Sequence, residues 1–400
     1  MQKMDIDKKD FNQISMNNAY NERNPSDNPI NRFFKDIFNY CLNLIKKNPN
    51  RNSKDINTKF IESFEYYKEH YKSNLNYHIK EPLNSKVGLI NLLNDCYIIT
   101  FLQILFHTPR FLIIIKNLNI KAQRDVIKYL ILVSEYPFNV EYFYKLKQLL
   151  GEINPEYSKP YSNDSQEFGI DLINYLISEL KGTIEEISYE MPTCQQEEQE
   201  EKLIEFKKEA LNLFISTYQV NQNELEKLFL FNQIDLFYYN NSIRPQISSN
   251  LHMELTLQKT MSYAKIGDLI DKKYNFDNSD MKSNLFFTKS NLVSLPNILI
   301  ISINRVLNNE RINNCLIEFE ENLDLKNCID YDLFNEYNKK TTYHLYSINE
   351  CFHSMRYSHY ICSIKINDKW YIFDDNKDVK ERSFVNRSSF VVGLFYIRDI

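Results

Sequence analysis

The sequence predicts an α+β fold in which a helical lobe precedes a lobe built on a largely antiparallel sheet. Residues 87–181 carry apolar side chains mostly at helical spacing. Beyond Asn250 the pattern changes to short alternating or β-rich runs separated by polar turns. Helices in one block and strands in the next are typical of the α+β class. A chain of 400 residues that is 43% hydrophobic can also bury the core that two lobes need.

The N-terminal part differs in composition from the rest of the chain. Residues 1–30 are polar and include the linker-like stretch NERNPSDNP, so we expect disorder there. The next two stretches, FFKDIFNYCLNLIKK and FIESFEYYKEHYK, have apolar residues at helical spacing. We therefore expect an N-terminal extension over residues 1–83, disordered at its start and then helical.

Helices are predicted at two places by their apolar spacing and their ends. In GLINLLNDCYIITFLQILFHTP, Asn94 or Asp95 can cap a helix that begins at Cys96, and Pro109 prevents its continuation. Farther along, VEYFYKLKQLL is expected to end at Gly151, because helices commonly end at a glycine.

The charged segment QQEEQEEKLIEFKKEALNLF, which starts at Gln195, predicts an amphipathic helix. Its glutamates are expected to form a solvated face, with a binding site as the alternative. The strands predicted beyond Asn250 are LHMELTLQ, LPNILIISINRV, YHLYSINE, HYICSIKI, KWYIF and FVVGLFYI.

Composition excludes several classes of protein. The seven cysteines are widely scattered and form no CxxC pair, so we expect no disulfide framework, no metal site and no cofactor. A net charge of −5 argues against a nucleic-acid partner. The start of the chain lacks a signal peptide and no apolar run is long enough for a membrane span, so we expect no membrane association and a cytoplasmic or nuclear location.

Cys96 stands where its thiol can become a nucleophile. In the first turn of a helix, the dipole and the free backbone N–H groups stabilise a thiolate. The alternative is that Cys96 is a small buried apolar side chain, which is the commoner role of an intracellular cysteine. A nucleophilic cysteine also needs a base, and the base needs an acceptor that orients it.

The segment HYICSIKINDKWYIFDD predicts a β-hairpin. Asn367 and Asp368 tolerate the two-residue turn, which would pair Ile366 with Lys369.

This register brings a histidine and a carboxylate together. His359 falls opposite Asn376, with Asp374 as its diagonal neighbour on the same face. A slip of one residue would present Asp375 instead. A strand histidine more often has a structural role, but with Cys96 these residues are the parts of a Cys/His/Asp hydrolase.

Five blocks of the chain resemble the ubiquitin-specific protease family of deubiquitinating enzymes. GLINLLNDCYIITFLQILFHTP is similar to the cysteine box, SNDSQEF to the QQDAxEF segment, and LPNILIISINRV to the LPxxLxIxLKRF strand. SHYICSIKINDKWYIFDD resembles the histidine box GHYxxYxxxxxxWxxFDD, and FVVGLFYIR the terminal AYxLFYxR. The blocks stand in family order and imply a catalytic domain over residues 84–398.

The resemblance implies a papain-like fold with a helical thumb, a sheet palm and a fingers subdomain that grips ubiquitin. It implies a thiol hydrolase that cleaves the isopeptide bond after the C-terminal glycine of ubiquitin, with ubiquitin and ubiquitinated proteins as partners. Cys96 would be the nucleophile, His359 the general base and Asp374 the residue that orients it. Asn91 would help to form the oxyanion hole.

Three more positions match family contacts with the extended ubiquitin tail. Asp164 and Glu167 would supply carboxylates for its arginines, and Tyr360 an aromatic contact. Asp164 and Glu167 also form a D-x-x-E pair that can cap the helix they precede, and the two roles are compatible.

The chain departs from the family pattern at positions that bear on activity. The expected fingers region has no cysteine, so we expect zinc-less fingers held by packing alone. Leu93 replaces a glycine, Asp95 a threonine and Ser358 a glycine. Asp95 would oppose thiolate formation unless its carboxylate caps the helix. Two alternatives therefore stay open: a weak or inactive ubiquitin-binding protein of the same fold, and a protease of a ubiquitin-like modifier.

Overall fold

The computed structural model divides the chain into two compact units, Met1–Lys72 and Ser73–Ile400. The structure describes residues 86–399, and every structural statement below concerns this part of the chain. Within it, these are left out: 92–93, 123–124, 160, 182–193, 196–199, 219–221, 240–241, 275–285, 308–310, 335–339, 354–357 and 376. The predicted extension over residues 1–83 lies outside the described residues.

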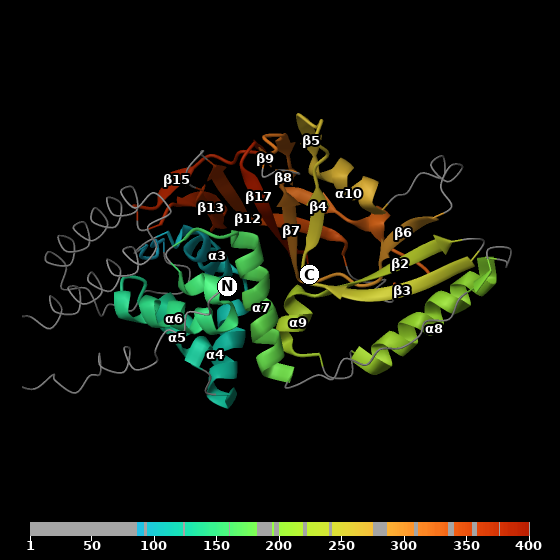
Figure 1. Ribbon diagram of the computed structural model, residues 1–400, viewed down its shortest axis with the longest axis horizontal. Coiled ribbons are helices and arrows are strands. Elements are labelled where there is room, and N and C mark those ends of the chain that lie inside the picture. The colour runs from blue at the N-terminus through green and yellow to red at the C-terminus, as the bar shows by residue number, and fades with distance from the viewer. Residues whose placement is uncertain are drawn as a thin grey trace, which may run out of the picture. The chain divides into compact units, whose positions relative to one another are not determined.

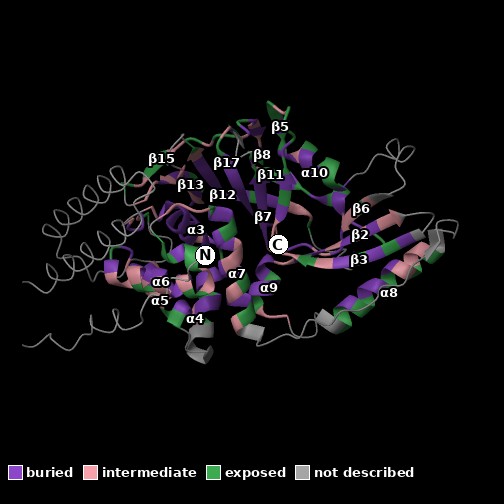
Figure 2. Cartoon of the chain, viewed as in Figure 1, coloured by how far each residue is buried: buried purple, intermediate pink, exposed green. Residues whose placement is uncertain are grey.

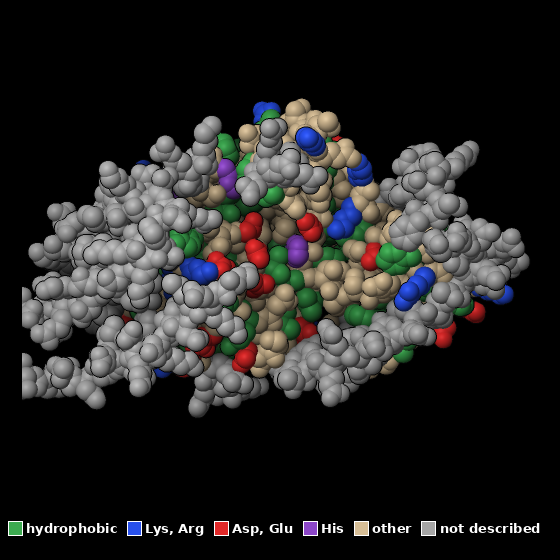
Figure 3. Space-filling model, in the orientation of Figure 1, with side chains coloured by type: hydrophobic (Ala, Val, Ile, Leu, Met, Phe, Trp, Pro, Cys, Tyr) green, Lys and Arg blue, Asp and Glu red, His purple; other side chains and the backbone are tan. Residues whose placement is uncertain are grey.

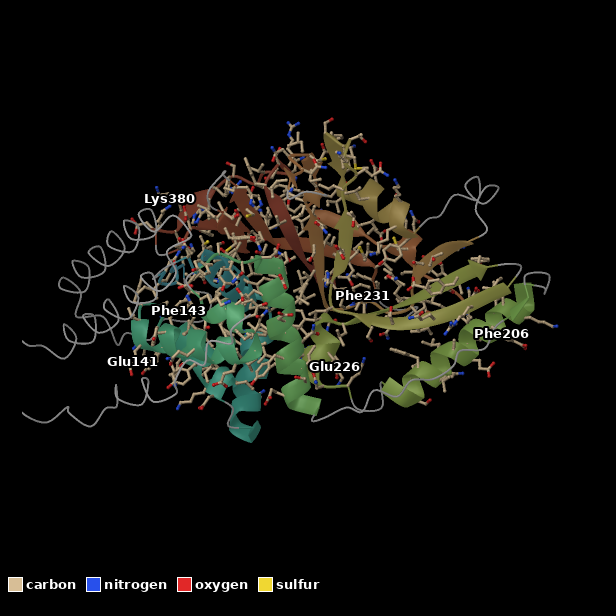
Figure 4. All side chains as sticks on the ribbon, in the orientation of Figure 1. Glu141, Phe143, Phe206, Glu226, Phe231 and Lys380 are labelled. Atoms are coloured by element: carbon tan, nitrogen blue, oxygen red, sulfur yellow. The ribbon has the colours of Figure 1, made fainter. Side chains whose placement is uncertain are left out.

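The first half of the described chain is helical, as predicted (Figure 1). Its helices are α3 (Cys96–His107), α4 (Phe111–Ala122), α5 (Asp125–Glu135), α6 (Val140–Ile153), the 3-10 helix η3 (Pro155–Ser158) and α7 (Ser165–Lys181). Phe143 on α6, labelled in Figure 4, is among the largest fully buried side chains. Large aromatic side chains on the inward faces thus form the core between these helices.

One helix cap and one helix end differ from the prediction. Helix α3 begins at Cys96 and ends before Pro109 as expected, but the side chain of Asp95 makes no capping hydrogen bond. Helix α6 continues past Gly151 to Ile153. Gly151 instead permits a close approach, since a Cβ atom there would lie 2.6 Å from Cβ of Ser158.

The second half contains an eight-stranded sheet whose order is β15-β14-β13-β12-β17-β7-β4, with β11 added beside β12. All its pairs are antiparallel except β4 with β7. The strands are β4 (Met253–Thr256), β7 (Ile298–Asn304), β11 (Asn322–Asp324), β12 (Thr342–His353), β13 (Ser358–Ile366), β14 (Lys369–Phe373), β15 (Lys380–Arg382) and β17 (Val391–Arg398). The six predicted strands are therefore confirmed.

The predicted hairpin is also confirmed. Strands β13 and β14 are antiparallel, with Ile366 opposite Lys369. Asn367 and Asp368 have φ values of 49° and 62°, the left-handed conformation that a two-residue turn of this kind requires.

Smaller elements complete the palm. They are β5 (Tyr263–Lys265), α10 (Ile266–Tyr274), β8 (Val306–Leu307), β9 (Arg311–Ile312), β10 (Leu316–Glu318), η5 (Lys326–Cys328) and β16 (Arg387–Ser388). Strands β16, β10 and β5 form a three-stranded sheet, and β8 pairs with β9.

A third region extends from the sheet lobe, where the fingers were expected (Figure 1). A four-stranded sheet of order β1-β3-β2-β6 is covered on one face by α8, and α9 leads into β2. These elements are β1 (Cys194–Gln195), α8 (Glu200–Tyr218), α9 (Glu224–Phe229), β2 (Phe231–Tyr239), β3 (Ser242–Asn250) and β6 (Phe286–Leu292). Apolar side chains of α8, among them Leu211 and Phe214, pack on Ile234, Leu236 and Ile247 of the sheet.

Packing is not all that holds the fingers, so the prediction of packing alone was wrong. Lys207 of α8 is buried and its ammonium group lies 2.7 Å from Asp330 and 3.1 Å from Asp332. The hydrogen bonds and charges of the two aspartates raise the pKa of Lys207, against the effect of burial. The helix therefore presents one buried apolar and charged face as well as its solvated one.

Helix α3 packs against both β13 of the large sheet and α7, in the helical lobe on the left of Figure 2. All of its residues except His107 are buried. Gly169 of α7 lets the two helices meet, because a Cβ atom there would lie 2.0 Å from the ring of Phe101. In the described residues no single helix has the length and apolarity of a membrane span. The pair Cys96–His107 and Phe111–Asn117, bent by 89°, meets those criteria only when taken together.

Candidate active site

The start of α3 places Cys96 against strand β13. The side chain of Cys96 is 4% exposed, and its thiol donates a hydrogen bond to the backbone carbonyl of Ser358, with Sγ and O 3.9 Å apart. Ser358 directly precedes His359, so this contact brings the cysteine of the helical lobe close to the histidine of the sheet lobe. Among the described residues no hydrogen bond joins Cys96 to His359.

His359 and Asp374 are paired, as the hairpin register predicts. His359 Nε2 lies 2.7 Å from Asp374 Oδ1, which leaves Nδ1 as the ring nitrogen available to a second partner. The other oxygen of Asp374 accepts from Lys377 Nζ at 2.7 Å. Although burial raises the pKa of Asp374, these two donors bring it below its usual value. Asp374 is therefore ionised, as an acceptor that orients an imidazole must be.

The thiol of Cys96 is protonated in this arrangement. Burial raises its pKa to about 12, and the charges of Asp375 and Asp95 contribute to the increase. The backbone N–H of Tyr360 lowers the pKa and offsets only part of this. The expected stabilisation of a thiolate by the helix start is thus outweighed by burial and by two carboxylates.

Asn91 is held by a carboxylate that the sequence pattern did not assign to the site. Its Nδ2 donates to Asp375 Oδ2 at 2.9 Å, and its Oδ1 accepts from the backbone N–H of Asp95 at 3.2 Å. Burial raises the pKa of Asp375 to about 6. The two consecutive aspartates of the FDD motif, Asp374 and Asp375, are the feature of the sequence that could have indicated a second carboxylate at this site. Asp375 has a left-handed backbone conformation, with φ of 53°. Its side chain therefore does not follow the alternation of an extended strand, on which the prediction of the hairpin faces depended.

Asp95 does not cap α3, and its charge raises the pKa of the Cys96 thiol, as expected for a carboxylate that is not a cap. Its carboxylate is 1% exposed and forms an ion pair with Lys147 of α6, which is 8% exposed. The second carboxylate oxygen has no hydrogen-bond partner among the residues that the structure describes. Asp95 is therefore a buried, paired anion and not a capping residue.

The three predicted tail-binding residues lie near α7. Asp164 caps this helix, because its Oδ1 accepts from the backbone N–H groups of Gln166 and Glu167 at 2.7 and 3.1 Å. Asp164 and Glu167 are both exposed, and burial together with Asp164 and Asp171 raises the pKa of Glu167. Tyr360 is only 4% exposed. Figure 3 shows acidic side chains near the middle of the viewed face.

Of the positions that depart from the family pattern, Leu93 lies outside the described residues. Ser358 contributes its carbonyl to Cys96, and its hydroxyl lies 2.9 Å from Nδ1 of His353.

One group of side chains in the described part of the chain could share a metal ion. Ligand atoms of His359, Asp374 and Asp375 lie within 4.8 Å of one another. Their closeness follows from the His359–Asp374 hydrogen bond, which a metal ion at Nε2 would break. We therefore interpret the group as an acid–base pair beside a second carboxylate, and the absence of a metal stays a prediction.

Comparison with solved structures shows what the fold is similar to. A chain of the Ubp8-Sgf11-Sgf73-Sus1 SAGA DUB module has 18% identity and a TM-score of 0.58, with 84% of this chain and 73% of that chain covered. The same module with a Ubp8 variant bound to monoubiquitin has 16% identity and a TM-score of 0.56, covering 86% and 76%. A yeast form of the module has 16% identity and a TM-score of 0.54, covering 84% and 72%. These likenesses show the papain-like fold of Ubp8.

Comparison with curated proteins finds no match. The model of one protein family, described as ubiquitin carboxyl-terminal hydrolase, matches residues 87–396. That match spans more than half of the chain and includes α3 and the β13–β14 hairpin. The chain therefore belongs to the ubiquitin carboxyl-terminal hydrolase family and is a cysteine-type deubiquitinase.

Proposed function

We propose that Cys96, His359 and Asp374 carry out hydrolysis of the isopeptide bond after the C-terminal glycine of ubiquitin. The observation that carries this assignment is the 2.7 Å contact between His359 Nε2 and Asp374 Oδ1, on the strand whose Ser358 carbonyl contacts the Cys96 thiol. The histidine is thereby oriented with Nδ1 free of the aspartate, beside a cysteine at the start of a helix.

The reaction that we propose has two stages. Nδ1 of His359 takes the proton of the Cys96 thiol, and the sulfur attacks the carbonyl carbon of the glycine. The C–N bond then breaks, the leaving lysine amine takes the proton from His359, and a thioester joins Cys96 to ubiquitin. Water, deprotonated by His359, attacks the thioester, which releases the ubiquitin carboxylate and returns the proton to the thiol.

Asn91 is proposed to stabilise the oxyanion together with the backbone N–H of Cys96. The side-chain amide of Asn91 carries N–H groups of the kind that stabilise an oxyanion, and its Nδ2 is oriented by the contact with Asp375. Asp375 would thus hold the amide in place during the reaction.

The resting thiol must change its partner before it can react. In this structure Cys96 donates to the Ser358 carbonyl, and burial with nearby carboxylates keeps it protonated. Reaction requires the thiol to turn from Ser358 toward Nδ1 of His359. We propose that the bound ubiquitin tail accompanies this turn.

Exposed carboxylates at the start of α7 support binding of the ubiquitin tail at this site. Asp164 and Glu167 are both exposed, although Asp164 also caps the helix. They fit the arginines of the ubiquitin tail as charge partners. Similar solved structures contain ubiquitin aldehyde or monoubiquitin bound to the Ubp8 module, which supports ubiquitin as the partner here.

The variant Cys96→Ser tests this function. We expect it to abolish hydrolysis of ubiquitin–aminocoumarin while leaving ubiquitin binding largely intact, because a hydroxyl is a far weaker nucleophile of similar volume. Turnover in the variant that equals the wild type would reject Cys96 as the nucleophile. A wild type that binds ubiquitin but is not labelled at Cys96 by a ubiquitin probe with a C-terminal electrophile would favour the inactive alternative.

A further inference from the structure

A buried ion pair lies next to the candidate nucleophile. Asp95 directly precedes Cys96, and its carboxylate pairs with the ammonium group of Lys147. Both side chains are almost fully removed from solvent, at 1% and 8% exposure. A buried carboxylate is strongly destabilising unless a partner compensates its charge, and Lys147 is the partner in this ion pair.

The fold directs Lys147 inward. Lys147 follows Phe143 by four residues on α6, so both lie on one face of the helix. Phe143, labelled in Figure 4, is 1% exposed. A lysine on this apolar face has no reason to be buried except its partner, and the partner is 52 residues away at the start of α3.

The other charged and titratable groups around Cys96 are mostly of one sign. Asp375 from the turn after β14 and Asp95 from its own chain segment both raise its pKa, as does Cys351 of β12. On β13, His359 is held by Asp374. Tyr97 on α3 also has its pKa raised, mainly by burial and then by Asp95. Removal of the positive charge of Lys147 would leave the carboxylate of Asp95, next to Cys96, without its ion-pair partner.

We propose that Lys147 is a positioning residue for the nucleophile, because its ion pair with Asp95 offsets part of the negative charge that directly precedes Cys96. This proposal rests on the proposed role of Cys96. A purely structural pair would tie α3 to α6 without affecting the thiol. The two roles differ in the sign of the effects on thiol reactivity when each charge is removed alone.

The experiment measures alkylation of Cys96 by iodoacetamide near pH 8 in the full chain, with the Cys96 peptide followed by mass spectrometry. Lys147→Met leaves a net negative charge, and Asp95→Asn leaves a net positive one. A charge this close changes the thiolate fraction on the order of tenfold. Because a more basic thiolate is also more nucleophilic, the rate changes by about threefold.

The expected order of rates depends on charge alone. Lys147→Met should be about threefold slower than the wild type and Asp95→Asn about threefold faster. The double variant, whose pair is again neutral, and Lys147→Arg should return close to the wild-type rate. Lys116→Met serves as a matched control, since it breaks a helix ion pair with Glu135 that does not adjoin Cys96.

Rates that move in the same direction in both single variants, or that stay unchanged, would overturn the proposal. If Lys147→Met does not fold, the comparison of Asp95→Asn with the double variant still decides, because only a charge effect makes the first faster than the second. Alkylation requires no ubiquitin. A failure of this proposal is therefore distinguishable from retained turnover in Cys96→Ser, which would reject the proposed function instead.

Discussion

At the scale of single residues, carboxylates determine how the candidate site responds to pH. Asp374 is held in its ionised form by His359 and Lys377. Asp375, the next residue, has its pKa raised to about 6 by burial. The two adjacent aspartates thus have opposite pKa shifts. Hydrogen bonds and charges of His359 and Lys377 outweigh burial at Asp374, whereas burial outweighs the charges of the same two residues at Asp375.

This difference predicts how Asp375→Asn affects stability. A folded-state pKa above the unfolded value means that the native state binds more protons between about pH 4 and 6, so stability falls as pH rises through that window. The asparagine variant has no carboxyl group to ionise at this position, so it does not lose stability in this pH window. We expect its free energy of unfolding, relative to the wild type, to be higher by about 1–2 kcal/mol at pH 7.5 than at pH 4.5.

Urea unfolding at the two pH values measures this prediction. Asp368→Asn is a suitable control, because this carboxylate is 99% exposed at the tip of the same hairpin. An equal change in stability at both pH values for Asp375→Asn would show that burial does not raise its pKa.

At the scale of elements, close packing of α3 against α7 holds the nucleophile in place. Phe101 of α3 is fully buried, with the rings of Phe168 and Phe395 at centroid distances of 6.3 and 5.6 Å. The ring therefore cannot move to admit a larger neighbour at Gly169. Such overpacking costs about 1–3 kcal/mol.

We accordingly expect Gly169→Ala to lower the free energy of unfolding by about 1–3 kcal/mol, despite the higher helix propensity of alanine. Gly267→Ala on α10 is the matched control. Its added Cβ would meet only Glu320 Oε1 at 3.7 Å, so propensity alone should stabilise it by about 0.5–1 kcal/mol. Chemical unfolding of both variants checks the prediction. An equal gain in both would show that α7 can shift away from α3.

The elements that could be predicted are those whose conformation depends on residues close together in the sequence. The ends of α3 and the turn at Asn367 and Asp368 depend on neighbouring residues, so sequence alone sufficed. The buried positions of Lys147 and Lys207 depend on carboxylates distant along the chain, and lysines in charged helices are usually exposed. The two ion pairs could not be predicted for that reason.

At the scale of the whole described structure, the site is assembled from two halves of the chain. Helix α3 supplies Cys96, while β13 and the segment after β14 supply His359 and Asp374. The five ordered sequence blocks predicted that these halves meet. The sequence blocks could not predict the polar contacts between the two halves, because these contacts depend on how side chains pack at the interface.

One such contact is made by Ser165 at the start of α7. Its hydroxyl donates to the backbone carbonyl of Tyr97 at 2.9 Å and accepts from Asn349 Nδ2 at 3.1 Å. Asn349 belongs to β12, the neighbour of the strand that carries His359. A single buried hydroxyl thus joins the helix of the candidate nucleophile to the sheet of the candidate base.

Ser165→Ala should lower the free energy of unfolding by about 1–3 kcal/mol, because the amide of Asn349 would be buried without a partner for its N–H groups. Oδ1 of Asn349 already has no partner within the described structure. Since the joined elements carry the reacting groups, we expect kcat for ubiquitin–aminocoumarin to fall more than KM changes. Urea unfolding and steady-state kinetics measure the two effects.

A second variant separates the hydrogen bond from the loss of volume. Adding Asn349→Leu to Ser165→Ala replaces both polar partners by apolar groups, which should restore part of the lost stability but not kcat. Ser178→Ala, which removes an exposed hydroxyl from the same helix, should leave both unchanged. If Ser165→Ala changes stability by less than about 0.5 kcal/mol, the contact does not join the halves, and apolar packing of α3 on β13 alone must position Cys96.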